Sequence, residues 1–201
     1  MRCDWKRLLL LALFLTCLPL PAFGNQEEPG PALARLMADL RAEAAKGRTI
    51  AYREEKHYAF LEQDLKSSGF LSFRPPDTLI REVLTPEPAR YIIKGPRLIM
   101  EEEGRPRREI NLGDYPQAAA FIEALRAVLA GDLPALERHF QVTLRSGHIR
   151  WTLQLIPRDP QMGKVVEAIS LTGRGGQVGE VRTSEAGGDY TLMVLSREAD
   201  Q

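Results

Sequence analysis

The order of the expected elements along the chain limits the fold more than any single motif does. A helical segment over residues 32–46 is followed by about five strand-like segments, then by one or two helical segments over residues 114–140, and then by about five more strand-like segments. Strands and helices do not alternate, so a parallel sheet with crossover helices is not expected. An antiparallel sheet of about ten strands tends to curl. The sequence therefore predicts a mainly β (α+β) fold, in which a strongly curved antiparallel sheet, or incomplete β-barrel, has helices forming a lid over its apolar concave face.

Residue periodicity supports this order of elements. The clearest strand covers residues 148–155, in which apolar and polar side chains alternate, so one face is expected to be buried and the other wet. Another strand is expected over residues 50–61, which are rich in Tyr and Phe. The central helical segment carries an apolar stripe over residues 118–129, with Asp114 as the expected cap and Gly131 as the stop.

The N-terminus, residues 1–24, has the pattern of a secretory signal peptide. Basic residues precede the apolar run "LLLLALFLTCLPLP", and the tripeptide "AFG" that ends at Gly24 matches a small-x-small cleavage site. Cleavage is expected to leave a single secreted domain, residues 25–201. Both cysteines, Cys3 and Cys17, lie in the removed segment. A lipoprotein signal ending at Cys17 is the alternative, and it fits less well because "FLT" lacks a small residue before the cysteine.

The rest of the chain contains no catalytic, metal-binding or cofactor motif. It has no G-x-S-x-G, H-E-x-x-H or P-loop sequence and no cysteine after residue 24, and its three histidines lie on separate elements. Without residues 1–24 the formal charge is about minus two, which provides no electrostatic footprint for nucleic acid. We therefore expect a protein that is not an enzyme, without metal, cofactor or nucleic-acid partner. The rival interpretation is a periplasmic hydrolase that uses Asp or His side chains in a cavity.

Apolar side chains are spread over most of the expected strands, which favours a container over a catalyst. For any one of them, a place in an ordinary sheet core is the simpler interpretation. Together they are expected to line a cavity for an apolar ligand, provided that the concave face is too large for two short helices to fill. The candidate cavity-lining residues are Phe60, Phe70, Leu79, Ile92, Ile122, Leu125, Trp151, Leu153 and Leu155.

The segment "SGFLSFRPPDTLIREVL", residues 68–84, gives the chain a family resemblance. A Gly-x-Leu followed by Arg-Pro, the strand "TLIREVL", the turn "TPEP" and the strands "RYIIKG" and "RLIM" resemble the periplasmic outer-membrane lipoprotein carrier family, LolA. The later segments "WTLQLIPRD", "VVEAISLTGRGGQVGEV" and "DYTLMVLS" are similar to the final meander of the same family. The resemblance covers residues 33–195.

The resemblance implies a half-open antiparallel barrel with a helical lid over an apolar cavity. It implies a carrier, expected to be a monomer, that binds the acyl chains of lipoproteins. The cargo would come from an ATP-driven release complex of the inner membrane and go to a receptor lipoprotein of the outer membrane. Arg74 matches the family's strand-end arginine, which hydrogen-bonds to the lid and holds it shut. Pro75 and Pro76 offer no N–H and would end the strand ladder beside it.

Two features depart from the family pattern. Sites where the carriers usually have aromatic residues read "LIREV" and "LIMEEE" here, and the central helical stretch is longer. One alternative is a divergent branch that carries another lipid-like cargo, such as a polyene or a glycolipid. A second alternative is a regulatory module of the same fold that senses lipoproteins.

Overall fold

The computed structural model describes residues 29–196, apart from the side chains of residues 29, 116–118, 120 and 121. The expected signal peptide, residues 1–24, lies outside the described residues, so it stays a prediction.

Eleven antiparallel strands form one sheet in the order β6-β5-β4-β3-β2-β1-β11-β10-β9-β8-β7. The last strand, β11, pairs with β1, so the two halves of the chain meet in the middle of the sheet. The strands are β1 (Thr49–His57), β2 (Leu65–Arg74), β3 (Thr78–Thr85), β4 (Ala89–Lys94), β5 (Arg97–Glu102), β6 (Arg108–Asn111), β7 (Phe140–Ser146), β8 (Trp151–Pro157), β9 (Val166–Arg174), β10 (Gln177–Glu185) and β11 (Tyr190–Ser196). Within the described part of the chain, β6 and β7 remain edge strands that do not pair with each other.

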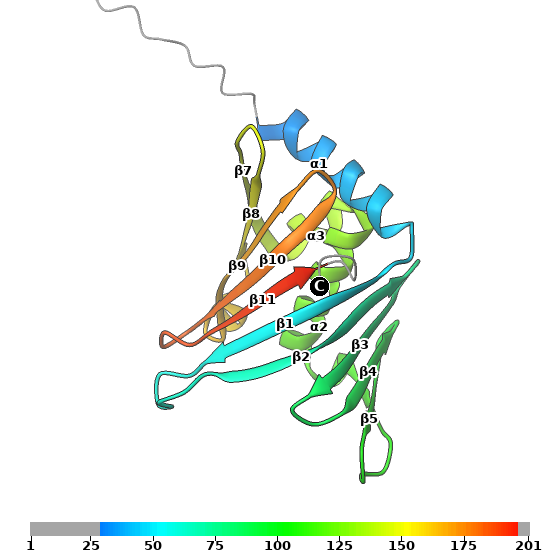
Figure 1. Cartoon of the computed structure of the whole chain (residues 1–201). Helices are drawn as coiled ribbons and strands as arrows, with labels where there is room; N and C mark the ends of the chain where they lie inside the picture. The colour runs from blue at the N-terminus through cyan, green and yellow to red at the C-terminus, as the bar shows by residue number, and fades with distance from the viewer. Residues whose placement is uncertain (1–28, 197–201) are drawn as a thin grey trace, which may run out of the picture.

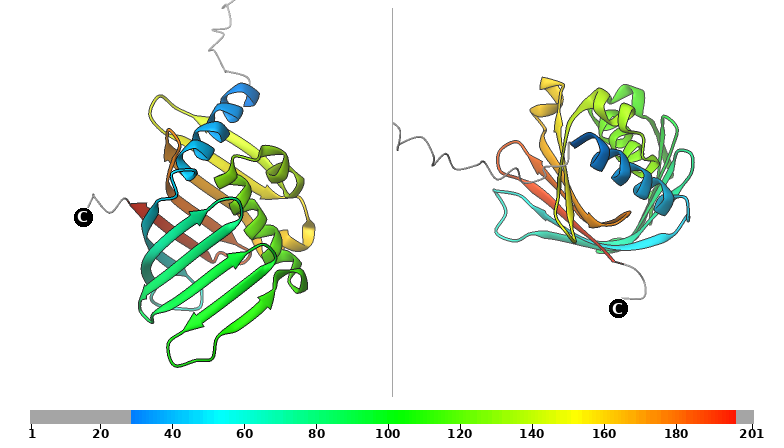
Figure 2. Two further views of the ribbon diagram at one scale, coloured as in Figure 1. Left: turned by 90° about the vertical axis from the view of Figure 1, so that its right-hand side faces the viewer. Right: turned by 90° about the horizontal axis from the view of Figure 1, so that it is seen from above.

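The helices lie on the concave side of the sheet (Figure 1). They are α1 (Pro29–Ala44), α2 (Pro116–Ala130), α3 (Leu133–His139) and α4 (Pro160–Gly163), with a short 3-10 turn, η2 (Leu112–Asp114), before α2. Viewed from above, the sheet curves around α1 and α2 and stays open on one side (Figure 2). The predicted fold class, a curved antiparallel sheet that is not closed and carries helices on its concave face, is confirmed.

Helix α1 packs through one apolar stripe, as its sequence spacing predicts. Leu33, Leu36, Met37 and Leu40 recur at helical intervals and are all buried. The backbone of α1 approaches two glycines so closely that no side chain would fit between them. A Cβ on Gly131, at the end of α2, would lie 2.2 Å from the Met37 carbonyl oxygen, and a Cβ on Gly176 would lie 2.2 Å from that of Asp39. Helix α1 therefore packs closely on both the end of α2 and the β9–β10 turn.

Helix α2 ends at Gly131, as predicted, but it does not begin with an aspartate cap. Gly131 adopts the left-handed conformation (φ 60°) that favours glycine at a helix end. At the other end the capping position is Tyr115, which makes no capping hydrogen bond through its side chain, and Asp114 belongs to the preceding 3-10 turn. The expectation for Asp114 was wrong because Asn111 already caps that turn, accepting a hydrogen bond from the Gly113 amide.

An arginine ties α1 to the C-terminus of α2. Arg41 Nε donates to the Ala130 carbonyl at 2.8 Å, and its Nη2 donates to the Gly131 carbonyl at 2.9 Å. The last carbonyls of a helix lack partners within the helix and carry partial negative charge, so a cation is favourable there.

The hydrophobic core occupies only one half of the concave face. Its largest cluster joins the three longer helices to β7, β8 and β9, and it includes Leu36, Leu40, Val128, Leu136, Phe140, Leu153, Leu155, Ile169 and Leu171. On the other half, the concave faces of β1 to β4 point toward α2 without joining this cluster. The helices thus cover the sheet unevenly.

The first strand is shorter than the sequence predicts. It ends at His57, and Tyr58 to Leu61 form a turn in which the Leu61 amide donates to the Tyr58 carbonyl. Asp189, in the β10–β11 turn, accepts a hydrogen bond from the Ala59 amide and holds this turn in place.

Candidate functional site

A cavity of about 910 Å³ lies between α2 and the uncovered part of the concave face. Its walls come from both halves of the sheet and from two helices. The apolar residues that line it include Leu40, Ile50, Leu71, Phe73, Leu79, Ile93, Ile122, Leu125, Val128, Leu129, Leu171, Val181, Met193 and Leu195. This volume is near the upper end of the range for small-molecule sites.

The cavity is long as well as large. Both ends of β9, Val166 and Arg174, line it, and that nine-residue strand is about 26 Å long at a rise of ~3.3 Å per residue. The walls along this length are mainly aliphatic, and the charged residues Arg48 and Arg174 stand exposed near one end. An elongated apolar molecule matches this shape and lining better than a compact polar one does.

The structure brings three of the nine candidate lining residues together at the cavity. Leu79, on β3, faces Ile122 and Leu125, on α2, across the cavity. Their positions follow from the strand alternation and the helical stripe that suggested them.

Phe70 and Ile92 point to the opposite face of the sheet, so their prediction as lining residues was wrong. Each sits beside a true lining residue on its own strand, Leu71 and Ile93 respectively, and successive side chains of a strand point to opposite faces. The sequence was ambiguous here because apolar residues occupy both faces of these strands. The register pairs Leu71 with Arg81, which also lines the cavity, so Leu71 and not Phe70 lies on the concave face.

Three other candidates belong to the core. Trp151 and Leu153 are buried without lining the cavity, and Leu155 borders only a small void of about 20 Å³ beneath α2. Trp151 Nε1 donates to the Gly175 carbonyl at 2.7 Å, which fixes the ring beside the β9–β10 turn. Phe60 was wrongly placed on a strand, since it lies in the β1–β2 turn with 79% of its surface exposed.

The wall formed by β1, β2 and β3 carries a polar cluster that the sequence did not reveal. Arg81 Nη2 donates to Glu54 Oε1 at 2.8 Å, and Arg81 Nε donates to the Tyr52 hydroxyl at 3.0 Å. Ser67 Oγ donates to the same Glu54 oxygen at 3.3 Å, and Lys56 Nζ lies 3.9 Å from it. Glu54 is only 4% exposed and is the single charged residue that is fully buried in the described part of the chain. We refer to these five residues as the wall cluster.

Burial and pairing act in opposite directions on Arg81. Desolvation tends to lower the pKa of its guanidinium, but the hydrogen bond and charge of Glu54, helped by Tyr52, outweigh this and raise the pKa. The guanidinium also lies 4.8 Å from the centroid of the Tyr52 ring, within the range of a cation–π contact. The wall cluster therefore holds a permanently charged guanidinium on the wall of a mainly aliphatic cavity.

A comparison with protein-family models identifies the chain. The model described as outer membrane lipoprotein carrier protein LolA-like matches residues 34–201. The chain belongs to this LolA-like family. The resemblance noted in the sequence is thereby confirmed over most of the chain. A comparison with curated proteins found no match.

Solved structures with similar folds are distant in sequence. A LolA superfamily protein from Nitrosomonas europaea is 11% identical, with a TM-score of 0.41 over 80% of this chain and 91% of that one. A DUF1329 family protein from Desulfovibrio piger is 11% identical, with a TM-score of 0.46 over 87% and 95% of the two chains. The Pseudomonas aeruginosa MucA/MucB complex contains a chain that is 12% identical, with a TM-score of 0.41 over 82% of this chain and 56% of that one. These similarities concern the fold alone.

In this LolA-like chain, Arg126 connects helix α2, which covers the cavity, to the sheet. Its Nη2 donates to the Gly95 carbonyl, in the β4–β5 turn, at 2.7 Å, while its buried Nε has no partner among the described residues. Burial lowers the pKa of this guanidinium, and the charges of Asp77 and Glu123 oppose the shift. Helix α2 is thus fastened to the far side of the cavity by a charged hydrogen bond.

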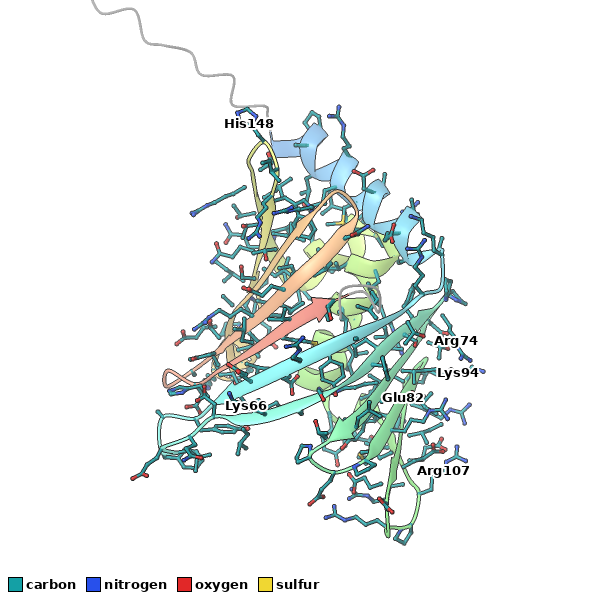
Figure 3. All side chains as sticks on the ribbon, in the orientation of Figure 1. Lys66, Arg74, Glu82, Lys94, Arg107 and His148 are labelled. Carbon is teal, nitrogen blue, oxygen red and sulfur yellow. The ribbon has the colours of Figure 1, made fainter. Side chains whose placement is uncertain are left out.

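Arg74 does not take this role in the structure. It is exposed at the end of β2, at the periphery of the molecule in Figure 3, and its side chain makes no hydrogen bond or ion pair with a described residue. The expected lid contact fails because Arg74 directly follows the lining residue Phe73 on β2, so its side chain points away from the concave face. Asp77, in the β2–β3 turn, lies within the electrostatic range of Arg126.

Replacing Arg126 with leucine is expected to speed the opening of α2. The substitution keeps the apolar stem and removes the charged hydrogen bond to Gly95, which contributes about 1.5–3 kcal/mol. Amide hydrogen exchange over residues 122–130 should therefore accelerate about tenfold or more. Arg138→Leu is the matched control, because Arg138, on α3, makes only an exposed ion pair with Glu123 on α2. Equal exchange rates in both variants would show that the Arg126 contact does not restrain α2.

None of the helices in the described residues is long and apolar enough to span a membrane.

Proposed function

We propose that this protein is an extracytoplasmic carrier that encloses the acyl chains of a lipid or lipoprotein and moves them between membranes without catalysing a reaction. The observation that carries this proposal is the cavity of about 910 Å³, lined mainly by aliphatic side chains, that the helices leave on the concave face. Membership of the LolA-like family and the signal-peptide pattern of residues 1–24 support a carrier in the periplasm.

The energy scale suits a reversible carrier. Each buried methylene contributes about 0.8 kcal/mol, so two to four methylenes offset the charged hydrogen bond between Arg126 and Gly95. A longer acyl chain therefore provides enough binding energy to open α2 and remain bound. Transfer would then require only an acceptor that binds the chain more tightly than this protein does.

The proposed partners follow from this role. Residues 25–201 would act as a monomeric single-domain carrier, loaded by an ATP-driven release complex of the inner membrane and unloaded at a receptor lipoprotein of the outer membrane.

The proposal is tested with a chain that begins at Asn25. A purified triacylated lipoprotein and its delipidated form are each mixed with the protein and separated by gel filtration. Co-migration of the acylated form alone is expected. Trp151 is a poor reporter for this titration, because its ring lies in the core and does not line the cavity. If neither the lipoprotein nor a panel of free lipids with chains of comparable length binds, the carrier proposal is wrong.

A further inference from the structure

We propose that the cavity selects lipids that carry one anionic headgroup, a carboxylate or a phosphate, and that this group pairs with Arg81 and Lys56 of the wall cluster. This inference rests on the proposed function, because the headgroup and the acyl chain would occupy the same cavity. Both cations line it, together with Glu54.

The wall cluster has hydrogen-bond donors to spare. Arg81 uses Nε for Tyr52 and Nη2 for Glu54 and Ser67, whereas its Nη1 donates to no described residue. Lys56 Nζ approaches Glu54 only at 3.9 Å, beyond hydrogen-bond distance. Nη1 is not sealed from solvent, since the buried donors without partners are on Arg90 and Arg126. A guanidinium edge and an ammonium group are therefore available to a ligand on the same wall.

The charge of the wall cluster favours an anion over a neutral polar group. Two cations face one carboxylate, which leaves one positive charge unbalanced. Glu54 fixes the position of Arg81 and is itself held by Ser67, so the donors are preorganised. A charge-assisted hydrogen bond is about twice as strong as a neutral one, and it is stronger still where a bound acyl chain excludes water.

The other charged residues that line the cavity are placed differently. Arg48, Arg150 and Arg174 are exposed and lie outside the central strands β1 to β3. Glu43, at the end of α1, and Glu180 and Glu185, on β10, are acidic groups in the lining that would disfavour an anion beside them. The wall cluster is thus where cations and spare donors coincide within the cavity.

A site for an anionic headgroup predicts a cargo other than the lipid part of a lipoprotein. The lipid-modified cysteine of a triacylated lipoprotein presents ester, amide and thioether groups, none of which is charged. A free fatty acid or a lipid with a terminal phosphate would satisfy Arg81 and Lys56 directly.

The test compares ligands that differ only in headgroup charge, at about pH 8, where a carboxyl group is ionised. One pair is a fatty acid and the alcohol of the same chain length, and the other is a lysophosphatidic acid and the matching monoacylglycerol. The protein should bind the anion of at least one pair about tenfold more tightly than its neutral partner. The ligand pair that shows the larger preference for the anion identifies the bound headgroup as a carboxylate or a phosphate.

Three variants locate that preference on the wall cluster. The double variant Glu54→Gln/Arg81→Gln removes both charges of the buried pair, because Arg81 alone cannot be replaced without stranding the Glu54 carboxylate. Lys56→Gln removes a half-exposed cation that has little structural role. Lys66→Gln is the control: it removes an equal charge on the neighbouring strand β2, where Lys66 pairs with Glu55 on the convex face and is 72% exposed (Figure 3).

The expected result is that the double variant and Lys56→Gln each reduce the preference for the anion to about threefold or less, while the neutral lipid binds as before and Lys66→Gln changes nothing. If the wild-type protein binds acid and alcohol equally, the headgroup site is wrong and the carrier proposal stands. A preference that persists in Lys56→Gln and in the double variant would also overturn the site. If no lipid of either pair and no lipoprotein binds, both proposals fail together. Should the double variant not fold by circular dichroism, Lys56→Gln decides alone.

Discussion

Replacing Ile93 with aspartate should weaken fatty-acid binding at least about tenfold. Ile93 lies on β4 and lines the cavity, and its strand neighbour Leu79 lines it too. A bound acyl chain would exclude water from the new carboxylate, and burying an ionised group without a partner costs several kcal/mol. The unliganded protein should stay folded, because water can reach this position in the empty cavity. Binding would be measured by isothermal titration calorimetry and folding by circular dichroism.

The matched control is Ile92→Asp. Ile92 is the adjacent residue on the same strand and has the same side chain, but it points to the convex face, where it pairs with Ile99. Its substitution should change the affinity less than about twofold. Equal losses in the two variants would mean that the acyl chain does not occupy the concave cavity.

The second large effect concerns the packing of Trp151, on β8, against Gly173, on β9. Gly173→Ala should destabilise the protein by about 2–4 kcal/mol, although it adds only one methyl group. The new Cβ would lie 2.1 Å from the Gln177 carbonyl oxygen and 2.3 Å from Cζ2 of Trp151. The Trp151 ring is held by its hydrogen bond to the Gly175 carbonyl, and the Gln177 carbonyl belongs to the backbone of β10, which pairs with β9. Overpacking at such a site forces backbone shifts.

Urea denaturation followed by Trp151 emission measures this loss, since Trp151 is the sole tryptophan after residue 24. Gly179→Ala is the control within the same part of the sheet, because the nearest atom to its new Cβ would be 3.9 Å away. That variant should stay within about 1 kcal/mol of the wild-type free energy of unfolding. A loss at Gly173 no greater than that at Gly179 would show that Trp151 does not pack as described.

The fold could be predicted from the sequence because its signals are local. The stripe of Leu33, Leu36 and Leu40 defined α1, and the alternation through residues 148–155 defined β8. The blocks of strands on either side of α2 excluded a parallel sheet. The end of β1 was misjudged, because the aromatic residues that follow it have high strand propensity but form a turn. The strand expected from residue 148 begins at Trp151, and Ile149 before it is 70% exposed.

The cavity was harder to predict because its lining depends on register. A shift of one residue exchanges the two faces of a strand, and the sequence of β2 places Phe70 and Leu71 side by side with no polar residue to separate the faces. The sequence also could not show that Trp151 lies in the core. The alternation of β8 correctly places Trp151 on the buried face, but in that part of the sheet the helices fill the concave side.

The polar contacts could not be predicted because they join distant positions. Arg81 meets Glu54 across the intervening strand β2, 27 residues away in sequence, and Arg126 meets Gly95 across 31 residues. In the sequence alone, Glu54, Arg81 and Arg126 each look like ordinary surface charges. The family resemblance directed attention to Arg74, but in this chain the strand-end arginine is exposed and the lid supplies its own arginine.

The most direct test of the central claim maps where an acyl chain lies. A fatty acid with a photoreactive diazirine in its chain is bound to the protein, irradiated, and located by mass spectrometry of proteolytic peptides. A chain enclosed by the concave cavity should label lining residues such as Leu71, Ile93 and Leu125, and excess unlabelled fatty acid should abolish these labels. Labels confined to the convex face around Ile92, or to the exposed turn around Phe60, would contradict the claim that the concave cavity carries the lipid.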